Sequence, residues 1–335
     1  MGQDKGWQAG WRTDLTPIEQ GLLGFSLVRL ARATFIAPAA LEALKSGAAG
    51  EVHSVFERTF NILIGGELVG VAQSGVSRNP INLITDIPAS ESMSALGVCK
   101  GMRVQKVGGR LLIGEVLEIS LEGAELWQPK TRAEKCLDSK SIKRNLELAK
   151  KLAADKAGRE GLGQLLSRVD EISASKVNLT PDLSAVARAV LPLLVQLLDA
   201  VKSEDIRGVG RVTQKLIGLG PGLSPSADDA LSGFMAALWW VSHSVNRGVD
   251  SMEEINRTIV DQASNTTLLS RQLLQHAARG EVNERVQEFL ETILSGAPSD
   301  VSTKVDRVLE IGETSGADMM VGLLLGARVG LEMKS

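Results

Sequence analysis

The stretch that most constrains this fold runs from Gly218 to Asp229, reads GLGPGLSPSADD, and precedes an apolar run. Three glycines and two prolines among its first eight residues exclude the interior of a helix or strand, so the stretch must form a shaped loop. The residues from Ala230 to Val241 then predict a buried helix. Ser226 is the predicted N-cap of this helix, and Asp229, three residues later, is predicted to return the capping hydrogen bond.

A glycine-rich loop that leads into a helix presents free backbone N–H groups, with the positive end of the helix dipole behind them. We therefore predict an anion site whose contacts come from Gly220, Gly222 and Ser224. Two adjacent carboxylates, Asp228 and Asp229, would repel an anion unless one of them is used in capping. This pattern favours a ligand with both acceptor-rich and donor-rich ends, or a metal between carboxylate and phosphate. The alternative is a tight loop and a capped helix with no ligand.

A weaker copy of this helix start lies about ninety residues later. Both copies follow Ser-x-x-Asp-x-x-x-Gly-x-x-x-small: Ser226, Asp229, Gly233 and Ala237 in the first, Ser315, Asp318, Gly322 and Gly326 in the second. Ser-x-x-Asp is a capping pattern, and small residues four apart allow another helix to approach closely. We predict that the two helices pack together about a pseudo-twofold axis, with both N-termini at one pocket. Coincidence combined with ordinary tight packing is the alternative.

Residues 1–132 predict an antiparallel β-rich domain, either a sheet or a small barrel, with helices near its start. Helices are expected over Pro17 to Ala33 and Pro38 to Lys45. Gly65-Gly66 and Gly108-Gly109 predict hairpin turns. Expected strands are Val52–Phe60, Asn61–Ile64, Leu68–Gln73, Ile81–Ile84, Met102–Val107, Arg110–Ile113, Val116–Leu121 and Ala124–Trp127.

Residues 133–335 predict an all-helical domain that carries the glycine-rich loop, so the fold class is α+β. Asp138 is a predicted helix cap, Pro192 a predicted kink, and Ser203 a predicted helix start. Further helices are expected over residues 165–175, 181–202, 252–263, 266–279, 282–294, 301–311 and 317–333.

Composition narrows the class of partner. The chain has 335 residues, 44% of them hydrophobic and 23% charged, which is typical of a soluble globular protein. A net charge of −3 without a long basic run argues against nucleic acid or an anionic membrane as the partner. The two cysteines, Cys99 and Cys136, lack metal-site spacing and are expected to be reduced thiols. No run is long and apolar enough for a membrane span, and we expect a cytoplasmic protein.

The loop and its later copy resemble known family signatures. The residues from Gly218 to Asp229 are similar to the signature of the AllH-type family, formerly a domain of unknown function. Thr314 to Gly322 is similar to its second signature. Val52 to Phe56 and the segment Leu126-Trp127-x-Pro129 also resemble the family, so the resemblance spans residues 50–330. Two residues depart from the usual pattern: Ser224 stands where threonine is common, and Ala227 where glycine is common.

The resemblance implies a subunit of oxamate carbamoyltransferase, a multi-chain enzyme of allantoin catabolism in anaerobic purine degradation. Its reaction exchanges oxamate and carbamoyl phosphate with oxalurate and phosphate. The expected ligand is thus a small carboxylate or carbamoyl compound. The expected partners are other enzyme subunits, with a homodimer as the alternative assembly, and no cofactor or metal is expected.

Carbamoyl transfer requires a phosphate cradle, a cation for the substrate carboxylate, and donors for the carbamoyl oxygen. Backbone N–H groups of the loop are expected to form the cradle, and those of Ser315, Gly316 and Ala317 to form a second donor set. Asp228 is the expected catalytic carboxylate, which holds the substrate amide or accepts its proton, if Asp229 is engaged in capping. Asp318 is more readily explained as a capping residue.

Neither signature contains a lysine or arginine, so the cation must come from Arg78, Arg271 or another subunit. Thr267, beside Thr266 at a predicted helix start, is a weaker ligand candidate that capping also explains. The histidines at 53, 243 and 276 are better explained as structural residues.

Two alternative functions remain open at this point. In the first, the chain is a non-catalytic metabolite-binding or scaffold subunit, in which the loop recognises a metabolite or a partner chain. Metal-dependent hydrolysis through Asp228 and Asp229 ranks last, because adjacent helical residues point about 100° apart around the helix axis.

Overall fold

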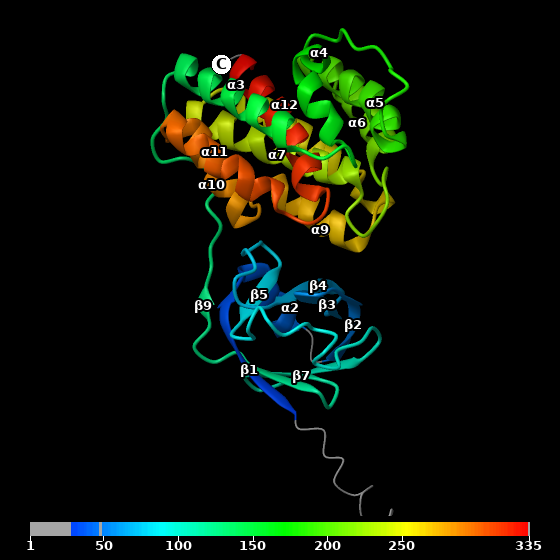
Figure 1. Cartoon of the computed structure of the whole chain (residues 1–335), viewed down its shortest axis with the longest axis vertical. Helices are drawn as coiled ribbons and strands as arrows, with labels where there is room; N and C mark the ends of the chain where they lie inside the picture. Colours follow the sequence, from blue (N-terminus) through cyan, green and yellow to red (C-terminus); the bar gives the residue numbers. More distant parts are fainter. Residues whose placement is uncertain (1–27, 47–48, 334–335) are drawn as a thin grey trace, which may run out of the picture.

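The computed structural model describes residues 28–46 and 49–333. A β-rich region and a helical region lie end to end along the long axis of the molecule, and the segment that contains β9 connects them (Figure 1). The last strand is β9 (Glu125–Leu126) and the first helix of the helical region is α3 (Ser139–Lys156). The predicted α+β order is therefore confirmed. The domain boundary near residue 132 falls between these two elements and stays a prediction.

The β-rich region is a closed barrel, which is one of the two forms that the sequence predicted. Strands β1–β8 form a ring in which β5 pairs with both β4 and β1, and β9 adds to β1. Alternate residues of β3, including Phe60, Ile62 and Ile64, fill the interior, and helix α2 (Pro38–Ser46) packs against the same core. The strands are β1 (Arg29–Ile36), β2 (Ala49–Val55), β3 (Thr59–Ile64), β4 (Glu67–Ala72), β5 (Asn82–Thr85), β6 (Arg103–Val107), β7 (Arg110–Ile113) and β8 (Leu117–Ser120).

Three features of the barrel differ from the sequence-based expectation. The helix expected over Pro17 to Ala33 is wrong where it can be tested, because Arg29–Ile36 is strand β1; residues 17–27 lie outside the described residues. The single strand expected over Val52–Phe60 is divided by a turn between β2 and β3. The barrel also includes parallel pairings, β1 with β8 and β9, and β4 with β5, which hairpin signals do not predict.

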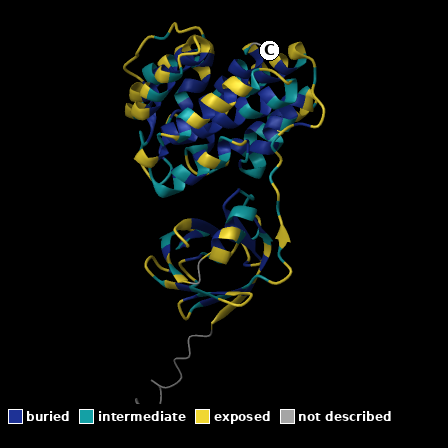
Figure 2. Cartoon of the chain, turned by 180° about the vertical axis from the view of Figure 1, so that it is seen from behind, coloured by how far each residue is buried: buried dark blue, intermediate teal, exposed yellow. Residues whose placement is uncertain are grey.

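The other helices of this region surround α7 (Ser226–Val245) and α12 (Ser315–Glu332), most of whose residues are buried. Figure 2 shows that buried residues occupy the interior of the helical region and exposed residues its outside. Asp138 caps α3 as predicted, whereas Asp205, not Ser203, caps α6. None of the helices in the described residues combines the length and apolar character that crossing a bilayer requires. The other elements are η1 (Gly163–Arg168), α4 (Val169–Ser173), α5 (Ala185–Lys202), α6 (Ile206–Leu216), α8 (Val249–Val260), η2 (Ala263–Asn265), α9 (Leu268–Ala277), α10 (Glu284–Ser295) and α11 (Pro298–Leu309).

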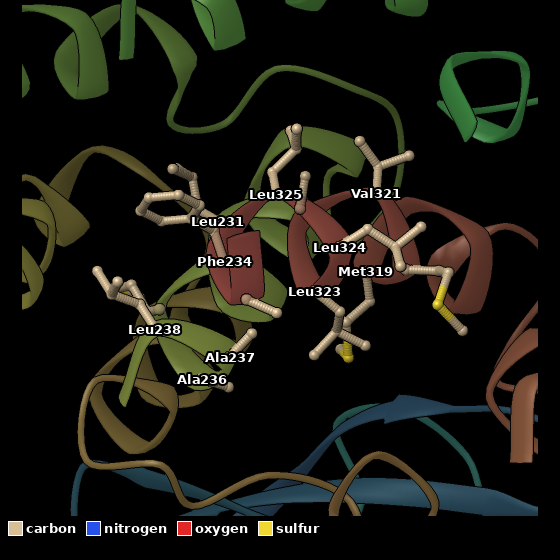
Figure 3. Packing of buried hydrophobic residues seen from close by; sticks show 14 of the residues in the cluster. Leu231, Phe234, Ala236, Ala237, Leu238, Met319, Val321, Leu323, Leu324 and Leu325 are labelled. Carbon is tan, nitrogen blue, oxygen red and sulfur yellow. The ribbon is translucent and has the colours of Figure 1, made fainter. Parts of the chain in front are cut away.

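Helices α7 and α12 pack against each other as the repeated pattern predicts. A side-chain carbon at Gly233 would overlap the carbonyl oxygen of Met319, and one at Gly322 would overlap the carbonyl oxygen of Ala230. These contacts are reciprocal, since Ala230 and Met319 occupy equivalent positions in the two copies. Large apolar side chains, including Leu231, Phe234 and Leu238 of α7 and Leu323 and Leu324 of α12, fill the surrounding core (Figure 3). The helices run parallel, so their N-termini lie at the same end.

Polar contacts join the barrel to the helical region. The Gln272 side-chain amide of α9 pairs with one peptide unit of β4: the Leu68 N–H donates to Oε1 at 2.9 Å, and Nε2 donates to the Leu68 carbonyl at 3.4 Å. Arg78 forms an ion pair of 2.6 Å with Glu284 of α10, and its guanidinium lies 4.5 Å from the centre of the Phe35 ring. Helix α9 therefore connects the barrel to the end of the helical region that carries the glycine-rich loop.

Candidate functional site

The start of α7 differs from the predicted capping arrangement. Pro225, with φ −55° and ψ 141°, is the N-cap, and Ser226 is the first helical residue. The N–H groups of Asp228 and Asp229 donate to the Pro225 carbonyl at 2.9 and 3.1 Å. Helix α12 likewise begins at Ser315, with Thr314 as its N-cap, and neither cap residue accepts a side-chain hydrogen bond. The prediction that Ser226 caps α7 and that Asp229 completes a capping box is therefore wrong.

The serines and aspartates of the two copies act across the helix pair instead. The Ser226 hydroxyl of α7 lies at Asp318 of α12 and favours its charged form. The Ser315 hydroxyl of α12 lies at Asp229 of α7 and does the same. This exchange has the symmetry of the glycine contacts further along the helices. The prediction that both N-termini converge is borne out by this geometry; a shared ligand pocket there stays a prediction.

Asp228 holds the loop against the helix start. Its Oδ1 accepts a hydrogen bond from the Gly218 N–H at 2.8 Å, and its Oδ2 accepts one from the Thr266 hydroxyl. The residue is 2% exposed, and burial raises its pKa, while the hydrogen bonds from Gly218, Thr266 and Ser270 oppose the rise. Because both oxygens have donors within the protein, these contacts give Asp228 a positioning role in the loop.

Asp229 lies at the interface with α12, beside the Ser315 hydroxyl. It is 4% exposed, and its Oδ1 accepts a hydrogen bond from the hydroxyl of Ser224 in the loop. Its Oδ2 is buried and accepts no hydrogen bond of ordinary geometry from the described residues. Burial raises the pKa of Asp229 to about 8; the charges of Asp318 and Asp228 add to the rise, and the Ser224 and Ser315 hydroxyls oppose it.

Asp318 occupies the equivalent position in α12 and is fully buried. Its Oδ1 accepts a hydrogen bond of 2.5 Å from the Leu162 N–H, and its Oδ2 accepts none of ordinary geometry within the described chain. Burial raises its pKa, while the Leu162, Ser226 and Thr314 donors oppose the rise. Sequence reasoning missed the Leu162 contact. Glycines at 158, 161 and 163 are typical of a break between helices and do not indicate this contact. Gly161 leaves no room for a Cβ beside the Asp318 carboxylate.

The glycine-rich loop presents unused backbone donors. Within the described residues, no hydrogen bond is formed by the N–H groups of Gly220, Gly222, Leu223, Ser224 and Ser226. Gly222 is exposed, has φ +90°, and has open space around its Cα, so the loop tip faces solvent. At the second helix start the Gly316 N–H is engaged with the Ile311 carbonyl at 2.9 Å. Of the predicted second donor set, only the N–H groups of Ser315 and Ala317 thus remain.

Thr267 and Arg271 lie at the start of α9, which contacts the loop, whereas Arg78 lies at the junction with the barrel. Thr267 caps α9, and its hydroxyl also donates to the Leu223 carbonyl at 2.6 Å, which fixes the loop to α9. One turn further along α9, Arg271 is partly exposed and forms no ion pair with another described residue. Arg78, by contrast, is paired with Glu284 at the junction with the barrel. Of the two predicted cations, Arg271 is therefore the one that lies on the helix fixed to the loop and lacks an ion-pair partner among the described residues.

Other features lie away from this site. A cavity of about 870 Å³ is at the opposite end of the helix pair, and its lining includes Asn246, Gly248, Val329 and Met333. His243 stacks on Trp239, with ring centres 4.2 Å apart. Among the residues that the structure describes, no group of three or more His, Cys, Asp or Glu side chains has the arrangement of a metal site. The described residues therefore contain no ligand set for the metal-dependent hypothesis.

Comparison with protein families assigns both regions of the fold. Residues 31–126 match the AllH family N-terminal domain, and residues 216–327 match the family described as oxamate carbamoyltransferase subunit AllH. The chain belongs to the AllH family. The match over residues 216–327 includes the loop, α7, α9 and the first part of α12. It therefore contains Arg271 and all three buried aspartates. The resemblance inferred from the loop is confirmed. No solved structure matches the chain significantly.

Proposed function

We propose that this chain is a subunit of a carbamoyltransferase that acts on a small carboxylate or amide, such as oxamate, with carbamoyl phosphate. The observation that carries the proposal is the set of unused N–H groups in the loop from Gly220 to Ser226, at the N-terminus of a buried helix. Such a loop binds phosphate or carboxylate through its backbone donors and the helix dipole. The name of the matched family supplies the reaction class and supports assembly with other chains.

In this reaction the amide nitrogen of oxamate forms a bond to the carbamoyl carbon, and the bond from that carbon to the phosphate oxygen breaks. The nitrogen loses a proton, and phosphate leaves. We assign the loop donors to the phosphate and the carbamoyl oxygen, where negative charge develops. Arg271 is assigned to the substrate carboxylate. Ser315 and Ala317 provide further backbone donors. A direct contact of Asp228 with the substrate amide stays a prediction, because its two oxygens here hold Gly218 and Thr266.

The test is phosphate release from carbamoyl phosphate and oxamate, measured for the chain alone and with its partner subunits. The informative variant is Gly220→Ala. Gly220 has φ +127°, and a Cβ there would lie 2.5 Å from the Ser226 nitrogen, so the variant displaces the donors. Gly158→Ala is the matched control, because a Cβ at Gly158 meets nothing within 4 Å. We expect activity to fall at least about tenfold, and only in Gly220→Ala.

The alternative is a non-catalytic metabolite-binding or scaffold subunit of a multi-chain enzyme. In that case the mixture of chains is active, and Gly220→Ala reduces assembly or leaves the turnover number unchanged. Equal activity of both glycine variants in an assembled complex would contradict a catalytic role for the loop.

A further inference from the structure

Three buried carboxylates lie at the N-termini of α7 and α12. Asp228, Asp229 and Asp318 are 2%, 4% and 0% exposed. None of them forms an ion pair with a described lysine, arginine or histidine. Two helix dipoles provide only about half a positive charge each. Three ionised side chains would therefore leave a net negative charge in the place where an anion is proposed to bind.

Hydrogen bonding distinguishes Asp228 from the other two. Both oxygens of Asp228 accept hydrogen bonds, from Gly218 and Thr266. Asp229 and Asp318 each have one bonded oxygen and one buried oxygen, Oδ2, without a partner of ordinary geometry in the described chain. A buried ionised oxygen without a donor is unfavourable, and a proton removes this cost. Asp318 accepts a hydrogen bond from the backbone N–H of Leu162, which favours its ionised form, whereas the bonded oxygen of Asp229 faces only the Ser224 hydroxyl, so the proton is assigned to Asp229.

We propose that Asp229 carries a proton in the resting protein, that Asp318 across the helix pair stabilises it there, and that the loop binds an anion only while this proton is present. The proposal rests on the assignment of the loop as an anion site and explains how that site tolerates adjacent aspartates. Ser224 connects the Asp229 carboxyl group to the anion site, because its hydroxyl contacts Asp229 and its unused N–H is one of the loop donors.

The charged groups around Asp229 all favour its protonated form. Burial raises the pKa of Asp229 to about 8, and Asp318 from α12 and Asp228 from α7 both add to the rise. The loop presents the Ser224 hydroxyl and α12 the Ser315 hydroxyl to Asp229, and neither group is charged. The proton is thus held at neutral pH and lost slightly above it. Its loss places a negative charge directly behind the loop donors.

The proton is tested by infrared spectroscopy of the full chain, which separates the C=O band of a carboxylic acid from that of a carboxylate. We expect the wild type to have an acid band that disappears with a midpoint near pH 8. Asp229→Asn should lack this band, and the exposed control Asp261→Asn should keep it. Asp318→Asn keeps an oxygen for the Leu162 N–H but removes a neighbouring charge, so the midpoint should fall. Absence of the band, or an unchanged midpoint in Asp318→Asn, overturns the assignment.

The link to anion binding is tested by calorimetric titration with sulfate, which does not itself change protonation in this range. Wild-type affinity should weaken about tenfold for each pH unit above the midpoint. Asp229→Asn should bind sulfate with no such dependence. Affinity in the wild type that is independent of pH, or no sulfate binding at any pH, contradicts the link. These readouts do not require turnover, so a chain that shows them but fails to transfer a carbamoyl group refutes only the proposed reaction.

Discussion

Replacing Asp229 with asparagine should change how stability depends on pH. A carboxyl group whose pKa is raised on folding keeps its proton in the folded state while the unfolded chain has already lost it. The free energy of unfolding therefore falls as pH rises between the two values and levels off above the higher one. For Asp229 this window runs from 3.8 in the unfolded chain to about 8 in the folded protein.

The magnitude follows from the width of the window. One proton contributes about 1.4 kcal/mol per pH unit, so a window of about 4 units corresponds to at most about 6 kcal/mol. The asparagine side chain has no proton to lose. The free energy of unfolding of the variant, relative to that of the wild type, should therefore increase with roughly this slope as pH rises. Asp228 and Asp318 also have raised pKa values, and they keep some pH dependence in both proteins.

The assay is urea unfolding of the wild type and Asp229→Asn at a series of pH values across the window. Asp261→Asn, a change of the same kind at an exposed position, is the control and should follow the wild type. If the difference between Asp229→Asn and the wild type stays constant with pH, Asp229 is not protonated in the fold, and the reasoning is refuted.

Two further changes test the geometry of the site. Gly322→Ala places a Cβ against the backbone of α7 and should reduce the free energy of unfolding by about 1–3 kcal/mol or more, measured by urea unfolding; a loss no larger than that of Gly158→Ala would show that the helices are not in contact there. Thr266→Val removes the hydroxyl that donates to Asp228, so it should cost about 1–3 kcal/mol and raise the pKa of Asp228 further. The control Thr258→Val removes only an exposed hydrogen bond and should change the free energy of unfolding by less than about 0.5 kcal/mol.

Local signals in the sequence predicted much of the architecture. Gly65-Gly66 and Gly108-Gly109 correctly marked hairpins of the barrel. Gly65, Gly66 and Gly108 have the positive φ that such two-residue turns need and that glycine accepts. The small residues four apart, Gly233 and Ala237 in one copy and Gly322 and Gly326 in the other, predicted the central helix pair. In both cases the decisive constraint acts within a few residues of the chain.

Features that depend on distant partners were not predicted. Strand β1 overlaps the end of the stretch from Pro17 to Ala33 that has helical periodicity, but its conformation is set by pairing with β5 and β8, which lie far along the chain. Asp229 and Asp318 had capping spacing, yet they accept hydrogen bonds from Ser224 and Leu162 instead. Asp228, which was expected to be free for the substrate, accepts one from Gly218. Such contacts depend on how loops return to the helix ends, which spacing alone does not encode.

The claim on which the account depends is that the loop at the joint N-termini of α7 and α12 binds an anion. The most direct test is amide hydrogen exchange of the full chain with and without inorganic phosphate, since the proposed donors are backbone N–H groups that lack partners in the described residues. Protection should increase in residues 218–229 and 314–318. Protection confined to the distant cavity, around residues 246–255 and 329–333, or no change at the loop, would contradict the account.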